Sequence, residues 1–173
     1  MSQTLGAGAH VSLTPPHGLE QIIATFGDIF DYIKPDHTLD PRWAAESLKR
    51  VALPFPIPLS WDLSRSVNTI TCHALLAEAF CEAFEGVLRE GLQPKIISFG
   101  GCFAFRPQRT GSKLSTHAWG IAIDLNSKSN AQGTLGDMDP SVVKLFERFG
   151  FEWGGKWQGS ARDPMHFQFC SGY

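Results

Sequence analysis

The segment Ser115-Thr116-His117-Ala118-Trp119-Gly120-Ile121-Ala122-Ile123-Asp124 is the part of the sequence on which the predicted fold depends. Its second half, continued by Leu125, is apolar on both faces apart from Asp124, which is typical of a strand in the middle of a sheet. A second segment, Asp163-Pro164-Met165-His166-Phe167, leads into a short apolar strand near the C-terminus. We expect the two strands to be neighbours, because that arrangement brings their polar side chains to one point.

These two segments supply a set of metal-binding side chains. His117, Asp124 and His166 offer two imidazoles and one carboxylate, and Asp163 adds a carboxylate three residues before the second imidazole. A catalytic zinc is typically held by three protein ligands with a fourth position open, whereas a structural zinc is usually closed by four. The pattern therefore predicts a zinc hydrolase in which Asp163 is the general base.

Each of these residues also has a simpler interpretation. Asp124 can face solvent at the end of a strand, although an ionised Asp among apolar neighbours is costly unless it is paired or coordinated. Asp163 can act only as the turn residue before Pro164. A cysteine hydrolase that pairs Cys102 with His117 and Asp124 is a further alternative, but no local signature of such a nucleophile is present.

The pattern of the whole chain predicts an α+β fold, with a small, mainly antiparallel sheet that carries the metal on one face and helices on the other. Residues 1–17 should form an extended or disordered arm, and residues 18–173 one domain with a helical part (18–94) and a metal-site sheet (95–173). Helices are predicted at 19–26, 41–49, about 68–90 and 140–149. Strands are predicted at 96–99, 120–125 and 165–169, whereas the prolines among residues 51–58 suggest an edge strand or an extended arm.

Composition excludes several classes of function. The net charge is −2, so there is no basic excess to attract nucleic acid. No apolar run approaches the roughly 18 residues of a spanning helix, and the first ten residues lack the basic and apolar regions of a signal peptide, which predicts synthesis in the cytosol. The four cysteines are scattered without a CxxC pair, so we expect free, mostly buried thiols.

Two separate parts of the chain carry a motif. The first reads SxHxxGxAxD from Ser115 to Asp124, and the second reads GFxWGGxW from Gly150 to Trp157, followed by DPMHF from Asp163 to Phe167. Together they resemble the zinc D-alanyl-D-alanine carboxypeptidase and L-alanyl-D-glutamate endopeptidase family, which belongs to a wider group with lysostaphin-type peptidases and the hedgehog domain. The resemblance is close over about residues 96–170 and loose before them.

The resemblance implies roles for individual residues. It assigns Zn²⁺ to His117, Asp124 and His166 and makes Asp163 the residue that activates water. It also implies an arginine that meets the substrate carboxylate or the developing oxyanion, for which Arg106 is the first candidate and Arg109 a close competitor. By the same resemblance Ser115 contacts substrate, with a cap or turn as its alternative role. Trp153, together with Trp157, is expected to form a pocket wall.

The implied activity is hydrolysis of an amide bond in peptidoglycan stem peptides, either D-Ala-D-Ala or L-Ala-D-Glu. A monomer made in the cytosol would then act on the cell wall after lysis or release, as a phage endolysin does, or on cytosolic muropeptides. The alternative is a zinc-containing cell-wall or peptide binding module without turnover. Retention of Asp163 argues against that alternative, because a pure binder needs no base.

Overall fold

The computed structural model describes residues 13–109 and 112–173. The predicted arm over residues 1–17 therefore lies largely outside the described residues. The α-helices are α1 (Gly18–Phe26), α2 (Pro41–Ser47), α3 (Ala77–Arg89) and α4 (Pro140–Arg148). The strands are β1 (Leu48–Leu59), β2 (Asp62–His73), β3 (Phe99–Gly101), β4 (Ala122–Leu125), β5 (Glu152–Trp153) and β6 (His166–Gln168).

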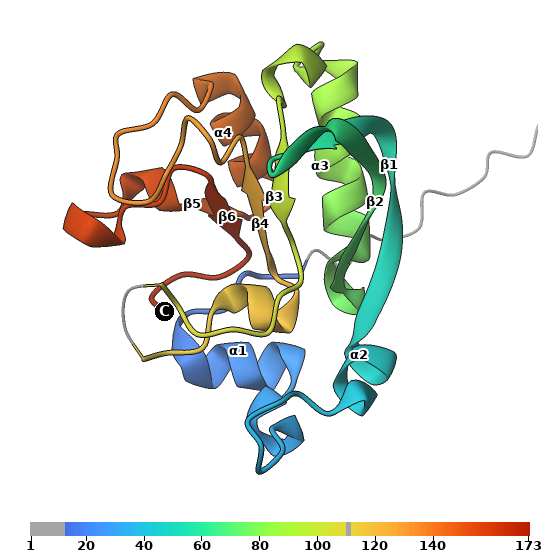
Figure 1. The fold of residues 1–173 in the computed structure, drawn as a ribbon, viewed down its shortest axis with the longest axis vertical. Helices are drawn as coiled ribbons and strands as arrows, with labels where there is room; N and C mark the ends of the chain where they lie inside the picture. Colours follow the sequence, from blue (N-terminus) through green and yellow to red (C-terminus); the bar gives the residue numbers. More distant parts are fainter. Residues whose placement is uncertain (1–12, 110–111) are drawn as a thin grey trace, which may run out of the picture.

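The six strands form one sheet in the order β2-β1-β3-β4-β6-β5. All neighbouring pairs are antiparallel except β1 and β3, which pair in parallel at Leu59 and Phe99. The predicted α+β fold with a mainly antiparallel sheet is thus confirmed. Figure 1 shows α3 and α4 together on one side of the sheet, while α1 and α2 lie beyond the ends of the strands. Among the described residues, no helix has the length and apolar character needed to cross a membrane.

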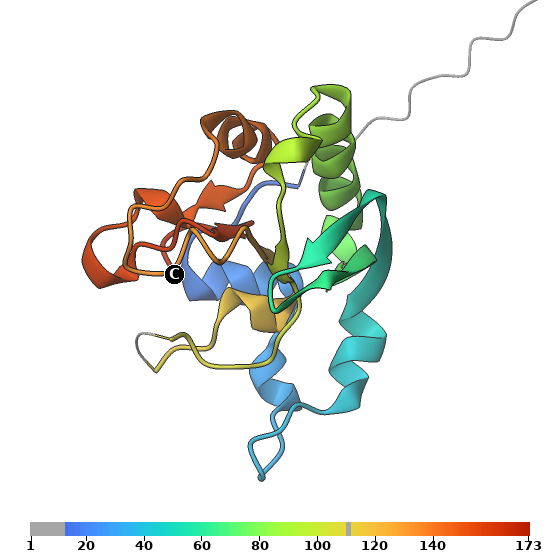
Figure 2. The same ribbon diagram turned by 45° about the horizontal axis from the view of Figure 1, so that its top comes forward.

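All four predicted helices are present, but the third begins later in the chain than predicted. Residues 62–73, which include Thr69, Ile70 and Cys72, form β2, and α3 begins only at Ala77. In β2, Ile70 and Cys72 are buried and flank Thr71 with the period of two that a strand requires. A long β-hairpin therefore lies between α2 and α3, within the part of the chain that was expected to be helical (Figure 2).

The segment with three prolines is an inner strand. In β1, Val51, Leu53, Phe55, Ile57 and Leu59 are buried and alternate with exposed or half-buried residues. The prolines lie between these positions. Regular pairing with β2 is interrupted between Ala52 and Ile57, so part of this strand makes few ladder hydrogen bonds that a missing N–H would break.

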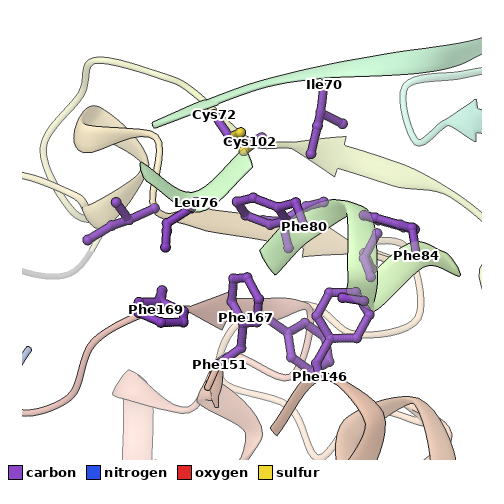
Figure 3. Close-up of a cluster of buried hydrophobic side chains, with 14 of the residues drawn as sticks. Ile70, Cys72, Leu76, Phe80, Phe84, Cys102, Phe146, Phe151, Phe167 and Phe169 are labelled. Atoms are coloured by element: carbon purple, nitrogen blue, oxygen red, sulfur yellow. The ribbon is translucent and has the colours of Figure 1, made fainter. Parts of the chain in front are cut away.

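The hydrophobic core lies between the sheet and helices α3 and α4. Phe80 and Phe84 of α3 meet Phe146 of α4 and Phe167 of β6, with ring centroids 5.6 Å apart for Phe84 and Phe146 and 4.8 Å for Phe146 and Phe167 (Figure 3). Along β6 the apolar Phe167 alternates with His166 and Gln168. Because successive side chains of a strand point to opposite faces, packing of Phe167 on the helices turns these two polar side chains away from them.

Candidate metal centre

Each predicted ligand comes from a rigid element near the middle of the sheet. His117 lies in a short 3-10 helix, Thr116–Trp119, which Ser115 caps by accepting a hydrogen bond from the His117 N–H at 3.4 Å. Gly120 ends this helix in the left-handed conformation, φ 71°, and sends the chain into β4, where Asp124 lies. Asp124 is directly opposite His166 in the antiparallel register of β4 and β6.

The three side chains converge on one point. The Asp124 Oδ1 atom lies 3.2 Å from His117 Nε2 and 3.0 Å from His166 Nδ1. One ligand atom from each residue falls within 4.8 Å of the other two, and all three residues are buried. Two imidazole nitrogens and one carboxylate oxygen form a donor set that suits zinc, and three protein ligands leave one position for substrate or water. The structure thus brings the predicted ligands together in an arrangement that fits the metal.

The nitrogens on the far side of each ring are also engaged. His117 Nδ1 lies 2.6 Å from the backbone carbonyl oxygen of Cys102. His166 Nε2 lies 3.1 Å from Gln168 Oε1 and 3.3 Å from Thr116 Oγ1. Such outer partners fix the orientation of a ligating imidazole and decide which nitrogen carries the proton.

Electrostatics keep Asp124 ionised. Burial opposes its charged form, but the charge and hydrogen bond of His117 and the hydrogen bond of His166 outweigh burial and lower the pKa of this carboxyl. Burial likewise opposes the charged form of His166, yet its hydrogen bond and charge interaction with Asp124 raise the pKa of His166. The carboxylate that would meet a metal is therefore already charged in the metal-free protein.

The pKa of Asp163 shifts in the opposite direction to that of Asp124. Burial is the main reason why its pKa is raised from 3.8 to about 6, and the negative charge of Asp124 contributes in the same direction. The Asp163 Oδ1 atom is buried without a hydrogen-bond partner among the described residues. A carboxylate with a raised pKa and a free oxygen is suited to take up a proton near neutral pH.

The Trp-Gly-Gly sequence of the second motif fixes the turn that carries Asp163. The Asp163 N–H donates to the Gly154 carbonyl at 2.9 Å, and the indole N–H of Trp153 donates to the Pro164 carbonyl at 2.7 Å. A Cβ atom at Gly154 would lie 2.6 Å from the Asp163 carbonyl oxygen, so a residue with a side chain does not fit there. The motif is thus explained by close packing behind Asp163.

A pocket of about 490 Å³ opens beside these residues. Among its lining residues are His117, His166, Asp163 and Ser115. Its charged wall contains three cations and one further carboxylate: Arg106, Arg109, Lys113 and Glu152. The excess of cations suits a substrate that carries a carboxylate.

The remaining predicted site residues differ in their position. Arg106 and Arg109 both line the pocket; the Arg106 side chain donates to the Pro107 carbonyl at 3.2 Å, and Arg109 is exposed. Trp153 does not line the pocket, because its indole packs against Gly155 and reaches Pro164. Trp157 lines the pocket instead, with its ring centroid 5.5 Å from that of His166.

Three residues around the site were missed in the sequence. Glu152 accepts a hydrogen bond from the Trp157 indole at 2.6 Å, and Thr116 and Gln168 contact His166. Only Gln168 could have been predicted from the sequence, because a residue two positions after a ligand on the same strand lies on the same face of the sheet. Thr116 and Glu152 depend on how a helix and an edge strand fold back onto β6, which local sequence does not specify.

The cysteine alternative is not supported by the geometry. The Cys102 side chain is buried in the hydrophobic core (Figure 3), and burial raises the pKa of its thiol well above the ordinary value. Only its backbone carbonyl faces His117. A nucleophilic cysteine needs a thiolate, and this environment favours the thiol. The expected free cysteines are confirmed, with Cys81 as the one that is only partly buried.

A comparison with protein families adds independent support. The family model described as D-alanyl-D-alanine carboxypeptidase matches residues 108–169, the part of the chain that contains His117, Asp124, Asp163 and His166. A comparison with curated proteins gives no significant match. Residues 108–169, with their His-Asp-His cluster, therefore confirm the predicted resemblance to the D-alanyl-D-alanine carboxypeptidase family of metallopeptidases.

Proposed function

We propose that the protein is a zinc peptidase that hydrolyses an amide bond in peptidoglycan stem peptides. In this proposal His117, Asp124 and His166 hold the zinc, Asp163 is the general base, and residues 18–173 act as one domain. The observation that carries the proposal is the convergence of two imidazoles with Asp124, beside a pocket that both imidazoles and Asp163 line.

The chain's own residues account for the steps of such a reaction. When bound, zinc would act as a Lewis acid on the scissile carbonyl and lower the pKa of a water molecule to about 7. The free carboxylate oxygen of Asp163 would accept the proton of the attacking water and pass it to the amine that leaves. In the metal-free protein burial raises the pKa of Asp163 to about 6, and its Oδ1 atom, which has no hydrogen-bond partner among the described residues, can take up a proton.

The cationic wall supports a substrate with a free carboxylate. Arg106 and Arg109 each offer a planar guanidinium fork that can bind a carboxylate through two hydrogen bonds. A stem peptide presents such a group at its C-terminal D-Ala and at its D-Glu, so both candidate bonds stay within the proposal. Arg106 remains our first candidate for the substrate arginine, because it is half-buried while Arg109 is exposed.

The test is digestion of purified sacculi and of a synthetic stem pentapeptide, with mass spectrometry of the products. Release of free D-Ala would identify a carboxypeptidase, and a new D-Glu N-terminus would identify an endopeptidase, as expected for an endolysin. Treatment with phenanthroline should abolish cleavage and added zinc should restore it. Full activity after exhaustive removal of metal would overturn the proposal.

A binding module without turnover is the competing function. It predicts zinc binding and peptide binding but no new termini. The unpartnered oxygen of Asp163 favours hydrolysis, because a buried polar atom without a partner carries a cost that a purely structural role would not justify. An Asp163→Ala variant that still binds zinc but does not hydrolyse would separate the two functions.

A further inference from the structure

The inner and outer nitrogens of the two histidines are clearly distinguished by their contacts. His117 Nε2 and His166 Nδ1 both face Asp124 Oδ1, so these are the nitrogens that would bind a metal. A ligating nitrogen is unprotonated, and the ring proton of a neutral histidine must then sit on the other nitrogen. His117 meets this requirement by donating its Nδ1–H to the Cys102 carbonyl. His166 needs an acceptor opposite Nε2.

Gln168 supplies that acceptor. Its Oε1 atom lies 3.1 Å from His166 Nε2 and 3.1 Å from the Thr116 hydroxyl, which donates to it. The other end of the amide fixes this orientation, since Gln168 Nε2 donates to the Cys170 carbonyl at 3.3 Å. A rotated amide would place its NH₂ group against the Nε2–H of His166 and its oxygen against the Cys170 carbonyl, so both contacts would be lost.

The position of Gln168 follows from the sheet. His166 and Gln168 are two residues apart on β6 and therefore share one face. Gln168 is 2% exposed, and glutamine is rarely buried to this extent because its polar atoms must all find partners. Its cross-strand neighbour on β4 is the small Ala122, which leaves room for the amide beside the ring.

We propose that Gln168 is a positioning residue that holds His166 in the orientation and tautomer required for metal binding, with the Thr116 hydroxyl as its support. The inference rests on the zinc site of the proposed function. Gln168 acts through His166 and does not itself bind the metal. Loss of an outer-shell partner of this kind typically weakens metal affinity about 10–100-fold.

The test is a direct measurement of zinc affinity by competition with a chromophoric chelator, together with the visible absorption spectrum of the cobalt-substituted protein. Gln168→Met keeps the length of the side chain but removes the acceptor, and should weaken zinc binding about 10–100-fold and change the cobalt spectrum. Gln168→Glu keeps an acceptor opposite Nε2 but loses the donor to the Cys170 carbonyl, and should bind zinc at least about threefold more tightly than Gln168→Met. Gln108→Met places the same change elsewhere in the pocket and should keep wild-type zinc affinity.

A second variant and a stability measurement distinguish a direct loss of zinc affinity from a folding defect. Thr116→Val removes the hydroxyl that donates to Gln168 Oε1 and lies 3.3 Å from His166 Nε2, and should weaken zinc binding by about threefold to tenfold. Urea unfolding with excess EDTA reports the stability of the metal-free protein for each variant. If Gln168 only stabilises the end of β6, Gln168→Met will unfold at a lower urea concentration but bind zinc as tightly as wild type. Alternatively, Gln168→Glu will lose as much zinc affinity as Gln168→Met. Either result overturns the inference, whereas a wild-type protein without zinc affinity would overturn the proposed function itself.

Discussion

Replacing Asp163 with asparagine should stabilise the metal-free protein while it removes hydrolysis. The pKa of Asp163 is about 6 in the folded protein against an ordinary 3.8, so ionisation at neutral pH opposes folding. At about 1.36 kcal/mol per pKa unit, the difference corresponds to at most about 3 kcal/mol. The side chain is only partly buried, and solvent screening reduces the expected gain to about 1–2 kcal/mol.

The sign of the pH dependence follows from the direction of the shift. Because the folded-state pKa is raised, the folded and unfolded states are both neutral at this position below about pH 3.8, and the cost develops as the pH rises through about 6. The gain from Asp163→Asn should therefore be complete above about pH 7, about half as large at pH 5 and absent below about pH 3.

Urea unfolding of both proteins in EDTA at pH 8 and pH 5 measures this difference. With zinc restored, the same variant should lose about 10²–10⁴-fold in kcat on a stem peptide, the range for removal of a general base. Its zinc affinity should stay near the wild-type value, because Asp163 is not one of the proposed ligands. The reasoning is refuted if Asp163→Asn is no more stable than wild type at pH 8, or if the gain is the same at both pH values.

Further predictions concern other parts of the fold. Gly120→Ala should lower the free energy of unfolding, measured in urea, by about 2–4 kcal/mol. The reason is that Gly120 has φ +71° and that an added Cβ would lie 2.8 Å from the His73 backbone nitrogen. Gly133→Ala is the control: with φ +82° and open space around the added Cβ, it should lower that free energy by only about 1 kcal/mol. Burial lowers the pKa of His73 below its ordinary 6.5, so wild type should lose stability relative to His73→Gln as the pH falls from 7 to 5, and parallel pH profiles would contradict this. Zinc at 100 times its Kd should raise the free energy of unfolding by about 2.7 kcal/mol, and calorimetry should show no such gain for Asp124→Ala.

The parts of the fold that local pattern determines were predictable from the sequence. Helices α2 and α4 each begin with an Asp that caps and a Pro at the first helical position, and the structure shows both. The predicted start of α3 was wrong because no helix-breaking residue separates residues 69–73 from the strongly amphipathic part of α3. Only pairing with β1, which is a long-range contact, decides that these residues form a strand.

The candidate site shows the same division. His117, Asp124 and His166 could be predicted as ligands because rare residue types match a family motif at fixed spacing, and the sheet register places Asp124 opposite His166. Trp153 and Trp157 were both expected at the pocket wall, but of the two it is Trp157 that lines the pocket. Which of two nearby tryptophans faces a cavity depends on the turn at residues 154–156, and that turn is set by contacts with Pro164 and Asp163.

Stability and chemistry occupy opposite faces of the same two strands. Ile123 of β4 and Phe167 of β6 are completely buried in the core, while Asp124 and His166, their neighbours in sequence, face each other at the site. A shift of register by one residue would exchange the two faces of a strand. The core contacts that stabilise the fold therefore also fix which side chains can meet a metal. We therefore expect a change in the packing of α3 and α4 on Phe167 to displace His166, although His117, Asp124 and His166 lie outside the four α-helices.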